Sequence, residues 1–371
     1  MNENYFILVK QNMLEMIKYS KSEFNKFKST KNSIYLQQAG EKLFNSIENY
    51  IALINKMRIE SFYEAKQLVI KDKPLQKLLF DNKVNKKLTL IVGCHNALSA
   101  FLAQEAGAHA LWASGYEFSA SMRLPDANIL TMSECLSISR SFTDRVTIPT
   151  IADCDNGFGN AINSIRTAVE YQRAEFSGIC IEDNVFPKRC SFYESKERHL
   201  ENIDTFVGKI KAVKDVIRER QHDNNFFLIA RTETLIVDNN NINEAIDRLL
   251  AYDKAGADGL LLHTKAKNNK DLESFFAVAN EIKKESKKYL FCVPTTYNWV
   301  TYEQLYGLGF DAIILANYGI RSCVKAMQDT FSKILNGESL SKGNDNVVPM
   351  KEIFRIVSTE DLRENESRYV L

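Results

Sequence analysis

Residues 241–264 have the sequence NINEAIDRLLAYDKAGADGLLLHT, in which a helical pattern passes directly into a strand pattern. The apolar positions of the first part recur every three or four residues, which is typical of an amphipathic helix. Gly256 follows the last helical turn and predicts that the helix stops there. The run GLLLHT (259–264) is short and mostly apolar, as expected of a buried strand. This stretch therefore predicts one helix–strand unit of an α/β protein.

The same alternation of strand and helix patterns recurs along the chain from about residue 73. The strand candidates are residues 88–93, 110–114, 147–153, 178–183, 226–231, 259–264, 289–295 and 311–317. Eight strands that alternate with helices over roughly 250 residues are the expected content of a (β/α)8 barrel. A doubly wound open sheet is the alternative, because periodicity alone does not show whether a sheet closes.

The first part of the chain has a different character. Residues 1–73 contain no proline and a single glycine, Gly40, and apolar positions such as Leu43, Ile47 and Ile51 recur at helical spacing. We therefore expect an α-helical extension over residues 1–73, followed by a catalytic barrel domain over residues 74–371. The extension is expected to pack on the barrel or on a partner subunit.

The composition limits the partners and the compartment. The 48 lysine and arginine residues nearly balance the 47 aspartate and glutamate residues, so we expect no nucleic-acid partner. No stretch approaches the ~20 apolar residues of a membrane span, and the N-terminus lacks the pattern of a signal peptide. Seven cysteines without a CxxC pair suit a reducing compartment. We expect a soluble cytoplasmic protein that does not contact membranes.

Charged side chains gather at the ends of neighbouring strand candidates, where a barrel carries its active site. Asp153 and Asp155 follow one strand, Glu182 ends the next, and Arg231 and His263 end the two after it. Carboxylates at two neighbouring strand ends indicate a hard divalent cation, and Mg²⁺ with one direct carboxylate and several waters fits them. The alternative is that these acids are solvated or form internal ion pairs. Arg231 is suited to bind a carboxylate or phosphate group.

Two further positions carry a weaker signal. Ser114 and Gly115 follow the strand 110–114, and their backbone N–H groups could bind an anion, since glycine permits close approach. Cys190 lies in a polar loop beside Lys188 and Arg189, and these cations are expected to lower the pKa of its thiol.

Nine motifs within residues 74–371 resemble the phosphoenolpyruvate mutase branch of the isocitrate lyase superfamily. They are CHNALSA (94–100), LWASG (111–115), IADCDNGFGN (151–160), CIEDNVFPKRCSF (180–192), IARTE (229–233), AGADGLLLH (255–263), VPT (293–295), ILANYGIR (314–321) and KEIFR (351–355). The resemblance implies a (β/α)8 barrel whose last helix is exchanged between subunits, in a homodimer or homotetramer. It also implies Mg²⁺ and a small-molecule 2-oxo acid or phosphonate substrate.

The resemblance also implies roles for individual residues. Asp153 matches the principal metal-binding aspartate, and Asp155 and Glu182 match acids that hold metal-bound waters. Ser114 and Gly115 match a backbone anion cradle with Trp112 as its neighbour, and Arg231 is expected to bind substrate too. The catalytic pocket and the gating loop are matched at Asp126, Lys188, Ser191, Arg231 and His263, and Cys190 lies in that loop as a further candidate catalytic residue.

Two residues depart from the mutase pattern. Cys190 stands where mutases carry asparagine, whereas the carbon–carbon lyases of the superfamily carry a catalytic cysteine in K-[KR]-C-G-H. Tyr116 stands where mutases have a smaller aliphatic residue, so the pocket is expected to have another shape.

The expected activity is that of a phosphoenolpyruvate mutase, an isomerase that forms the carbon–phosphorus bond of phosphonate biosynthesis. One alternative is a carbon–carbon lyase of a 2-methylisocitrate-like or dimethylmalate-like acid, with Cys190 as its acid. A second is a hydrolase of phosphonopyruvate or oxaloacetate, and a third is a binding adaptor without enzymatic activity.

Overall fold

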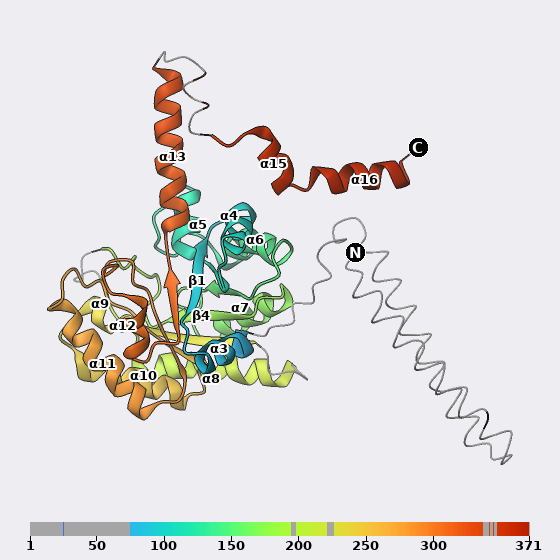
Figure 1. Ribbon diagram of the computed structural model, residues 1–371. Helices are drawn as coiled ribbons and strands as arrows, with labels where there is room; N and C mark the ends of the chain where they lie inside the picture. The colour runs from blue at the N-terminus through green and yellow to red at the C-terminus, as the bar shows by residue number, and fades with distance from the viewer. Residues whose placement is uncertain are drawn as a thin grey trace. The chain divides into compact units, whose positions relative to one another are not determined.

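The computed structural model describes residues 25, 75–193, 198–220, 226–336, 341, 344 and 347–370 (Figure 1). Apart from Asn25, the helical extension expected over residues 1–73 lies outside the described residues and stays a prediction. The barrel belongs to a compact unit that spans residues 71–347, whereas residues 348–371 belong to a second unit. The two are described separately.

Eight parallel strands form a closed barrel in which neighbouring strands follow the order of the sequence (Figure 1). They are β1 (Thr89–Cys94), β2 (Ala110–Ala113), β3 (Thr150–Asp153), β4 (Gly178–Glu182), β5 (Phe227–Thr232), β6 (Gly259–Leu262), β7 (Tyr289–Cys292) and β8 (Ala312–Leu315). β8 pairs with β1 from Thr89↔Ala312 to Val92↔Leu315, which closes the sheet on itself. The predicted (β/α)8 barrel is confirmed, and the open sheet is excluded.

Helices alternate with the strands along the chain. They are α3 (Leu75–Val84), α4 (Ala97–Glu105), α5 (Gly115–Ser121), α6 (Met132–Thr143), α7 (Ala161–Arg173), α8 (Ile203–Arg220), α9 (Thr234–Val237), α10 (Ile242–Lys254), α11 (Asp271–Glu285), α12 (Tyr302–Gly307) and α13 (Tyr318–Leu335). Of the helices in the described ranges, none combines the length and the apolar character that a membrane crossing requires.

Local sequence signals explain where several helices begin and end. Asn96, Thr131 and Asn160 are N-caps of α4, α6 and α7, and each forms a reciprocal capping box with the third residue of its helix. Gly256 follows α10 with a φ of 103°, a left-handed conformation that glycine adopts without steric cost. The stop that the sequence predicts after Lys254 is therefore confirmed.

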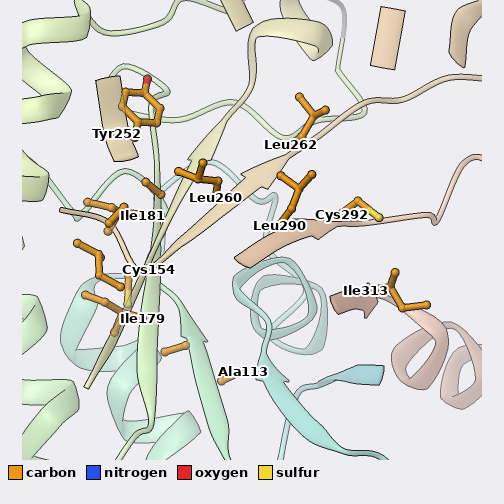
Figure 2. Close-up of a cluster of buried hydrophobic side chains, with 14 of the residues drawn as sticks. Ala113, Cys154, Ile179, Ile181, Tyr252, Leu260, Leu262, Leu290, Cys292 and Ile313 are labelled. Carbon is orange, nitrogen blue, oxygen red and sulfur yellow. The ribbon is translucent and has the colours of Figure 1, made fainter. Parts of the chain in front are cut away.

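Two buried apolar clusters occupy opposite faces of the strands. Ile179 and Ile181 of β4 belong to the larger cluster, part of which is shown in Figure 2, while Cys180 between them belongs to the smaller one. The smaller cluster takes residues from all eight strands, including Trp112 and Phe291, and therefore fills the barrel interior. This packed interior leaves the strand ends and their loops as the place for a site.

The helix that follows β8, α13, exposes an apolar stripe. Val324, Met327 and Phe331 recur at helical spacing and are 46%, 47% and 53% exposed. In the separate C-terminal unit, α15 (Met350–Ile356) and α16 (Thr359–Tyr369) expose Phe354 and Leu362. Such stripes are suited to pack on another helix. The exchange of the last helix between subunits stays a prediction, and the α13 stripe favours it.

Candidate active site

The carboxyl ends of the strands surround a cavity of about 70 Å³. Ten of the twelve residues predicted as site residues line it: Trp112, Ser114, Asp126, Asp153, Glu182, Lys188, Cys190, Ser191, Arg231 and His263. The other two, Gly115 and Asp155, lie directly beside them. A Cβ atom on Gly115 would be 3.1 Å from Asp155 Oδ1 and 3.8 Å from Asp153 Oδ2, so the whole predicted set is brought together at one place.

Four buried carboxylates form the acidic side of this cavity. Asp153 ends β3, Glu182 ends β4, and the N–H of Asp155 donates to Asp153 Oδ1 at 3.3 Å; Asp126 comes from the loop after α5. Burial raises the pKa of Asp155 to about 8, with Asp126 and Asp153 adding to the rise and Lys188 opposing it. A cation among these oxygens would favour their ionised forms.

Lys188 provides one positive charge from the loop after β4. Its Nζ lies 2.9 Å from Asp126 Oδ1 and forms a second ion pair with Asp155. Although burial alone lowers the pKa of Lys188, Asp126 and Asp155 hold that pKa well above its usual range. The Lys188 backbone N–H donates to Asn128 Oδ1 at 2.5 Å, and Asn128 Nδ2 donates to Asp155 Oδ2 at 2.8 Å. The first half of the loop is thereby anchored on the acidic side.

Arg231 provides the basic side and is held by a buried network. Its Nε lies 3.1 Å from Glu182 Oε2 and 2.7 Å from Glu233 Oε1, and its Nη2 donates to Ser191 Oγ at 3.2 Å. His263 Nδ1 lies 2.6 Å from Glu233 Oε1. Burial lowers the pKa of His263. Burial alone would raise the pKa of Glu233, but Arg231 and His263 hold it well below its usual range. Glu233 is therefore the ionised centre of this network.

Cys190 corrects one expectation. The sequence predicts that Lys188 and Arg189 lower the pKa of its thiol, but burial raises this pKa more than the Phe192 N–H and Lys188 lower it. Lys188 is occupied by two carboxylates, and Arg189 is exposed to solvent. The prediction of a lowered pKa is wrong, and Cys190 is a neutral thiol on the cavity wall.

The predicted anion cradle lies at the start of α5. Ser114 is the N-cap, and its Oγ accepts from the Glu117 N–H at 3.3 Å. The Ser114 N–H donates to the Cys94 carbonyl at 3.2 Å, so it is engaged by β1. Gly115 is the first residue of the helix, where N–H groups have no acceptor within the helix. Of the two predicted cradle N–H groups, that of Gly115 is thus the one available to an anion.

Tyr116, the second departure noted in the sequence, forms part of the cavity wall. Its ring packs edge-to-face on Phe192, with 6.1 Å between the ring centroids. A second cavity of about 240 Å³ is lined by Tyr116, Ala120, Leu124, Pro125, Asp126, Cys190, Phe192 and Tyr193. Tyr116 and Phe192 line both cavities, as do Asp126 and Cys190.

Three residues that organise the site have no predicted role. Asn128 links Asp155 to the backbone of Lys188. Glu233 joins Arg231 to His263. Arg198 donates to Glu233 Oε2 at 3.1 Å and to the Cys190 carbonyl. The strand-end rule could have indicated Glu233, which lies two residues after Arg231. Asn128 and Arg198 lie in irregular loops, where no periodic pattern marks them.

The acidic side suits a metal ion that keeps most of its water ligands. Within the part of the chain that the structure describes, no group of three or more His, Cys, Asp or Glu side chains is arranged to hold a metal ion directly. The carboxylates of Asp153, Asp155 and Glu182 offer oxygen donors only, which Mg²⁺ prefers, and Mg²⁺ commonly binds through one or two carboxylates and several waters. The residues present therefore fit Mg²⁺ held largely through water.

Comparisons with known proteins connect this geometry to a group of enzymes. The model of the family described as "Phosphoenolpyruvate phosphomutase" matches residues 80–335. The phosphoenolpyruvate phosphomutase of Tetrahymena pyriformis is 35% identical over 286 residues, which cover 77% of this chain and 92% of that protein. The phosphonopyruvate hydrolase of Variovorax sp. (strain Pal2) is 36% identical over 285 residues, which cover 76% of this chain and 95% of that protein.

A solved structure gives the same relationship. A phosphonopyruvate hydrolase in complex with oxalate and Mg²⁺ matches with a TM-score of 0.71 and 34% sequence identity, covering 81% of this chain and 99% of that chain. The likeness thus extends over the entire barrel of both proteins.

Proposed function

Because this chain belongs to the phosphoenolpyruvate phosphomutase family, we propose that it interconverts phosphoenolpyruvate and phosphonopyruvate through a pyruvate enolate. In this isomerisation the bond between phosphorus and the C2 oxygen breaks and a bond between phosphorus and C3 forms, with no net gain of water or protons. The observation that carries the proposal is the family match over residues 80–335, a range that contains all eight strands and every predicted site residue.

We assign Mg²⁺ to the acidic side of the cavity. Asp153 is its direct ligand, and Asp155 and Glu182 hold its waters. The oxygen-only donor set supports this assignment, as does the Mg²⁺ in the complex of the related hydrolase. When bound, Mg²⁺ supplies Lewis-acid stabilisation of the negative charge on the enolate oxygen.

The anionic groups of the substrate are bound by Arg231 and by the backbone at the start of α5. Arg231 keeps its positive charge at any physiological pH and offers a planar set of donors that matches a carboxylate or a phosphoryl group. The Gly115 N–H adds a backbone donor at the start of α5, and Trp112 and Ser114 line the cavity beside it. Phosphoryl transfer requires mainly correct positioning and electrostatic stabilisation, and these residues provide both.

The loop after β4 excludes water from the transfer. Lys188 attaches the loop to the acidic side of the cavity through Asp126 and Asp155. Ser191 attaches it to the basic side through Arg231 and Glu233. Water that entered would capture the phosphoryl group in place of the enolate. The neutral thiol of Cys190 adds no negative charge beside the transferring group.

We also propose that the enzyme is a homodimer or homotetramer in the cytoplasm. The apolar stripe of α13 supports association between copies. All seven cysteines are unpaired thiols, which suits a reducing compartment.

A coupled assay tests the activity. The protein is incubated with Mg²⁺, phosphonopyruvate, pyruvate kinase, lactate dehydrogenase and NADH, with or without ADP. A mutase produces phosphoenolpyruvate, which pyruvate kinase converts to pyruvate only when ADP is present, so NADH oxidation must depend on ADP. NADH oxidation at the same rate without ADP would identify a hydrolase and contradict the proposal. The Asp153→Asn variant serves as the control and should lose at least ~10²-fold in kcat.

A further inference from the structure

The loop after β4 leaves and rejoins the barrel at a paired base. The Val185 N–H donates to the His199 carbonyl at 3.0 Å, and the Glu201 N–H donates to the Asp183 carbonyl at 2.8 Å. Asn184 and Leu200 form an antiparallel bridge between these two contacts. These hydrogen bonds fix the base of the loop. The position of residues 188–191, farther along the loop, therefore depends on the side chains that contact them.

Arg198 reaches from this base to the middle of the loop. Its Nη1 donates to Glu233 Oε2 at 3.1 Å, and its Nη2 donates to the Cys190 carbonyl. Ser191 Oγ donates to the same Glu233 oxygen at 3.1 Å. The side chains of Arg198 and Glu233 are both 0% exposed, so their charge-assisted hydrogen bonds are shielded from water. Glu233 thereby connects the loop to the end of β5.

Arg198 is the second buried guanidinium on Glu233, after Arg231. Two like charges on one carboxylate repel each other, and Arg198 Nε has no hydrogen-bond partner among the described residues. A buried donor without an acceptor lowers stability. The contact that distinguishes Arg198 is its hydrogen bond to the Cys190 carbonyl, which fixes the segment of the loop that lines both cavities.

We propose that Arg198 is a positioning residue that holds residues 188–191 closed over the active site and so limits attack by water on the transferring phosphoryl group. This proposal rests on the mutase function proposed above. In the side reaction that Arg198 suppresses, the phosphorus–C3 bond of phosphonopyruvate breaks and a water oxygen bonds to phosphorus. One proton of that water goes to C3 of the enolate, and the products are pyruvate and inorganic phosphate.

Alkylation of Cys190 measures the closure directly. Wild type and Arg198→Gln are treated with N-ethylmaleimide, and labelling of the Cys190 peptide is followed by mass spectrometry. The expected rate is about tenfold faster in Arg198→Gln, because the loss of a charge-assisted hydrogen bond populates the open loop. Electrostatics alone acts in the opposite direction, since Arg198 lowers the pKa of Cys190 and its removal would leave less thiolate. A rate equal to or below that of wild type overturns the proposal.

Asp311→Asn is the control. Asp311 is a buried carboxylate that precedes β8, at the end of the barrel away from the loop; it pairs with Lys83 at 3.0 Å and accepts from the Leu290 N–H at 2.9 Å. The control should lower the melting temperature without changing the Cys190 labelling rate more than about twofold. Equal acceleration in both variants would mean that general destabilisation opens the loop, and this outcome also overturns the proposal.

The second readout is the partition of products. With phosphonopyruvate, Arg198→Gln should raise the ratio of inorganic phosphate to phosphoenolpyruvate by about tenfold over wild type, and Asp311→Asn should leave it unchanged. An unchanged ratio in Arg198→Gln overturns the claim that Arg198 limits attack by water. A wild type that forms only phosphate contradicts the mutase function itself, and the labelling rates then still decide whether Arg198 holds the loop. If Arg198→Gln does not fold, both tests are made with Arg198→Lys. Lysine keeps a positive charge beside Glu233 but cannot bind Glu233 and the Cys190 carbonyl at the same time as the guanidinium does.

Discussion

Glu233 is the residue on which the basic side of the site depends, because it is the shared carboxylate of two buried guanidinium groups. Replacing it by glutamine removes the carboxylate that pairs with Arg198 and leaves Arg231 with Glu182 as its remaining partner. We predict that Glu233→Gln lowers the free energy of unfolding by ~3–5 kcal/mol at pH 7, the usual cost of removing one member of a buried ion pair. Urea unfolding measures this value. Glu244→Gln, which affects a half-exposed partner of Arg248, should cost about 1 kcal/mol or less.

The same variant has a defined pH dependence. The pKa of Glu233 lies well below its ordinary value of 4.5 in the folded protein, so its contribution is fully present above pH 4.5 and is lost as the pH falls through the lower folded-state value. The stability difference between wild type and Glu233→Gln should therefore shrink as the pH falls below 4.5. A difference that keeps growing below pH 4.5 would contradict this account.

Cys190 distinguishes mutase from lyase chemistry. A mutase does not need an acid at this position, so we predict that Cys190→Ser retains kcat/KM for phosphonopyruvate within about tenfold, or ~1.4 kcal/mol of barrier. A lyase that uses Cys190 as its acid should lose ~10²–10⁴-fold. Steady-state kinetics with phosphonopyruvate and with a methylisocitrate-like acid separates the two. Release of pyruvate or glyoxylate from the latter, abolished by Cys190→Ser, would support the lyase.

At the residue scale, the sequence predicts the members of the site better than their charge states. Asp153, Glu182, Arg231 and His263 could be predicted because strand ends converge in a barrel. The pKa of Cys190 could not, because it depends on burial by residues distant in sequence and on the commitment of Lys188 to Asp126 and Asp155. Contacts made by loops depend on how the folded chain brings distant residues together, and no periodic pattern in the sequence indicates them.

At the scale of elements, all eight predicted strands are present, but their ends differ from the prediction. The candidate 147–153 begins at Thr150 in the structure, and the candidate 289–295 ends at Cys292. Apolar residues continue beyond the paired segment in both cases, since Ile148 and Val293 pack on the core without belonging to a strand. Hydrophobicity therefore located the strands, whereas backbone pairing sets their limits.

The apolar stripe of α13 gives a prediction about assembly. Val324→Glu combined with Phe331→Glu should convert a dimer or tetramer into monomers, because each charge would be buried without a partner in a helix–helix contact. Size-exclusion chromatography with light scattering measures the mass. The control is Lys325→Glu with Asp329→Lys, which reverses an exposed ion pair on another side of the helix. A wild-type monomer, or an unchanged mass in the double glutamate variant, would rule out α13 as the contact.

At the scale of the whole molecule, closure of the barrel is the feature that the sequence left open. Eight alternating units are compatible with a closed or an open sheet, and the decision lies in the pairing of β1 with β8, whose residues are more than 200 positions apart. Consecutive pairing makes the ends of β3, β4, β5 and β6 neighbours, and closure brings residues of β2 and β8 to the same cavity. The acidic and basic sides of the site follow from that arrangement.

Metal binding should stabilise the whole molecule. The acidic side is buried and holds four carboxylates against the one charge of Lys188, and burial, with Asp126 and Asp153 adding to it, raises the pKa of Asp155. We predict that Mg²⁺ at about 100 times its dissociation constant adds ~2.7 kcal/mol, a rise of ~3–5 °C in melting temperature, which EDTA reverses. Differential scanning fluorimetry measures the shift. Asp153→Asn should abolish it, and an equal shift in this variant would exclude Asp153 as the direct ligand.

The central claim is that this barrel moves a phosphoryl group between oxygen and carbon within one molecule. Phosphorus-31 NMR of the wild-type protein with Mg²⁺ and phosphonopyruvate tests it most directly. We predict that the phosphonopyruvate resonance is replaced by that of phosphoenolpyruvate, while the sum of the two stays constant. Growth of inorganic phosphate in step with pyruvate, without phosphoenolpyruvate at any time, would contradict the mutase assignment.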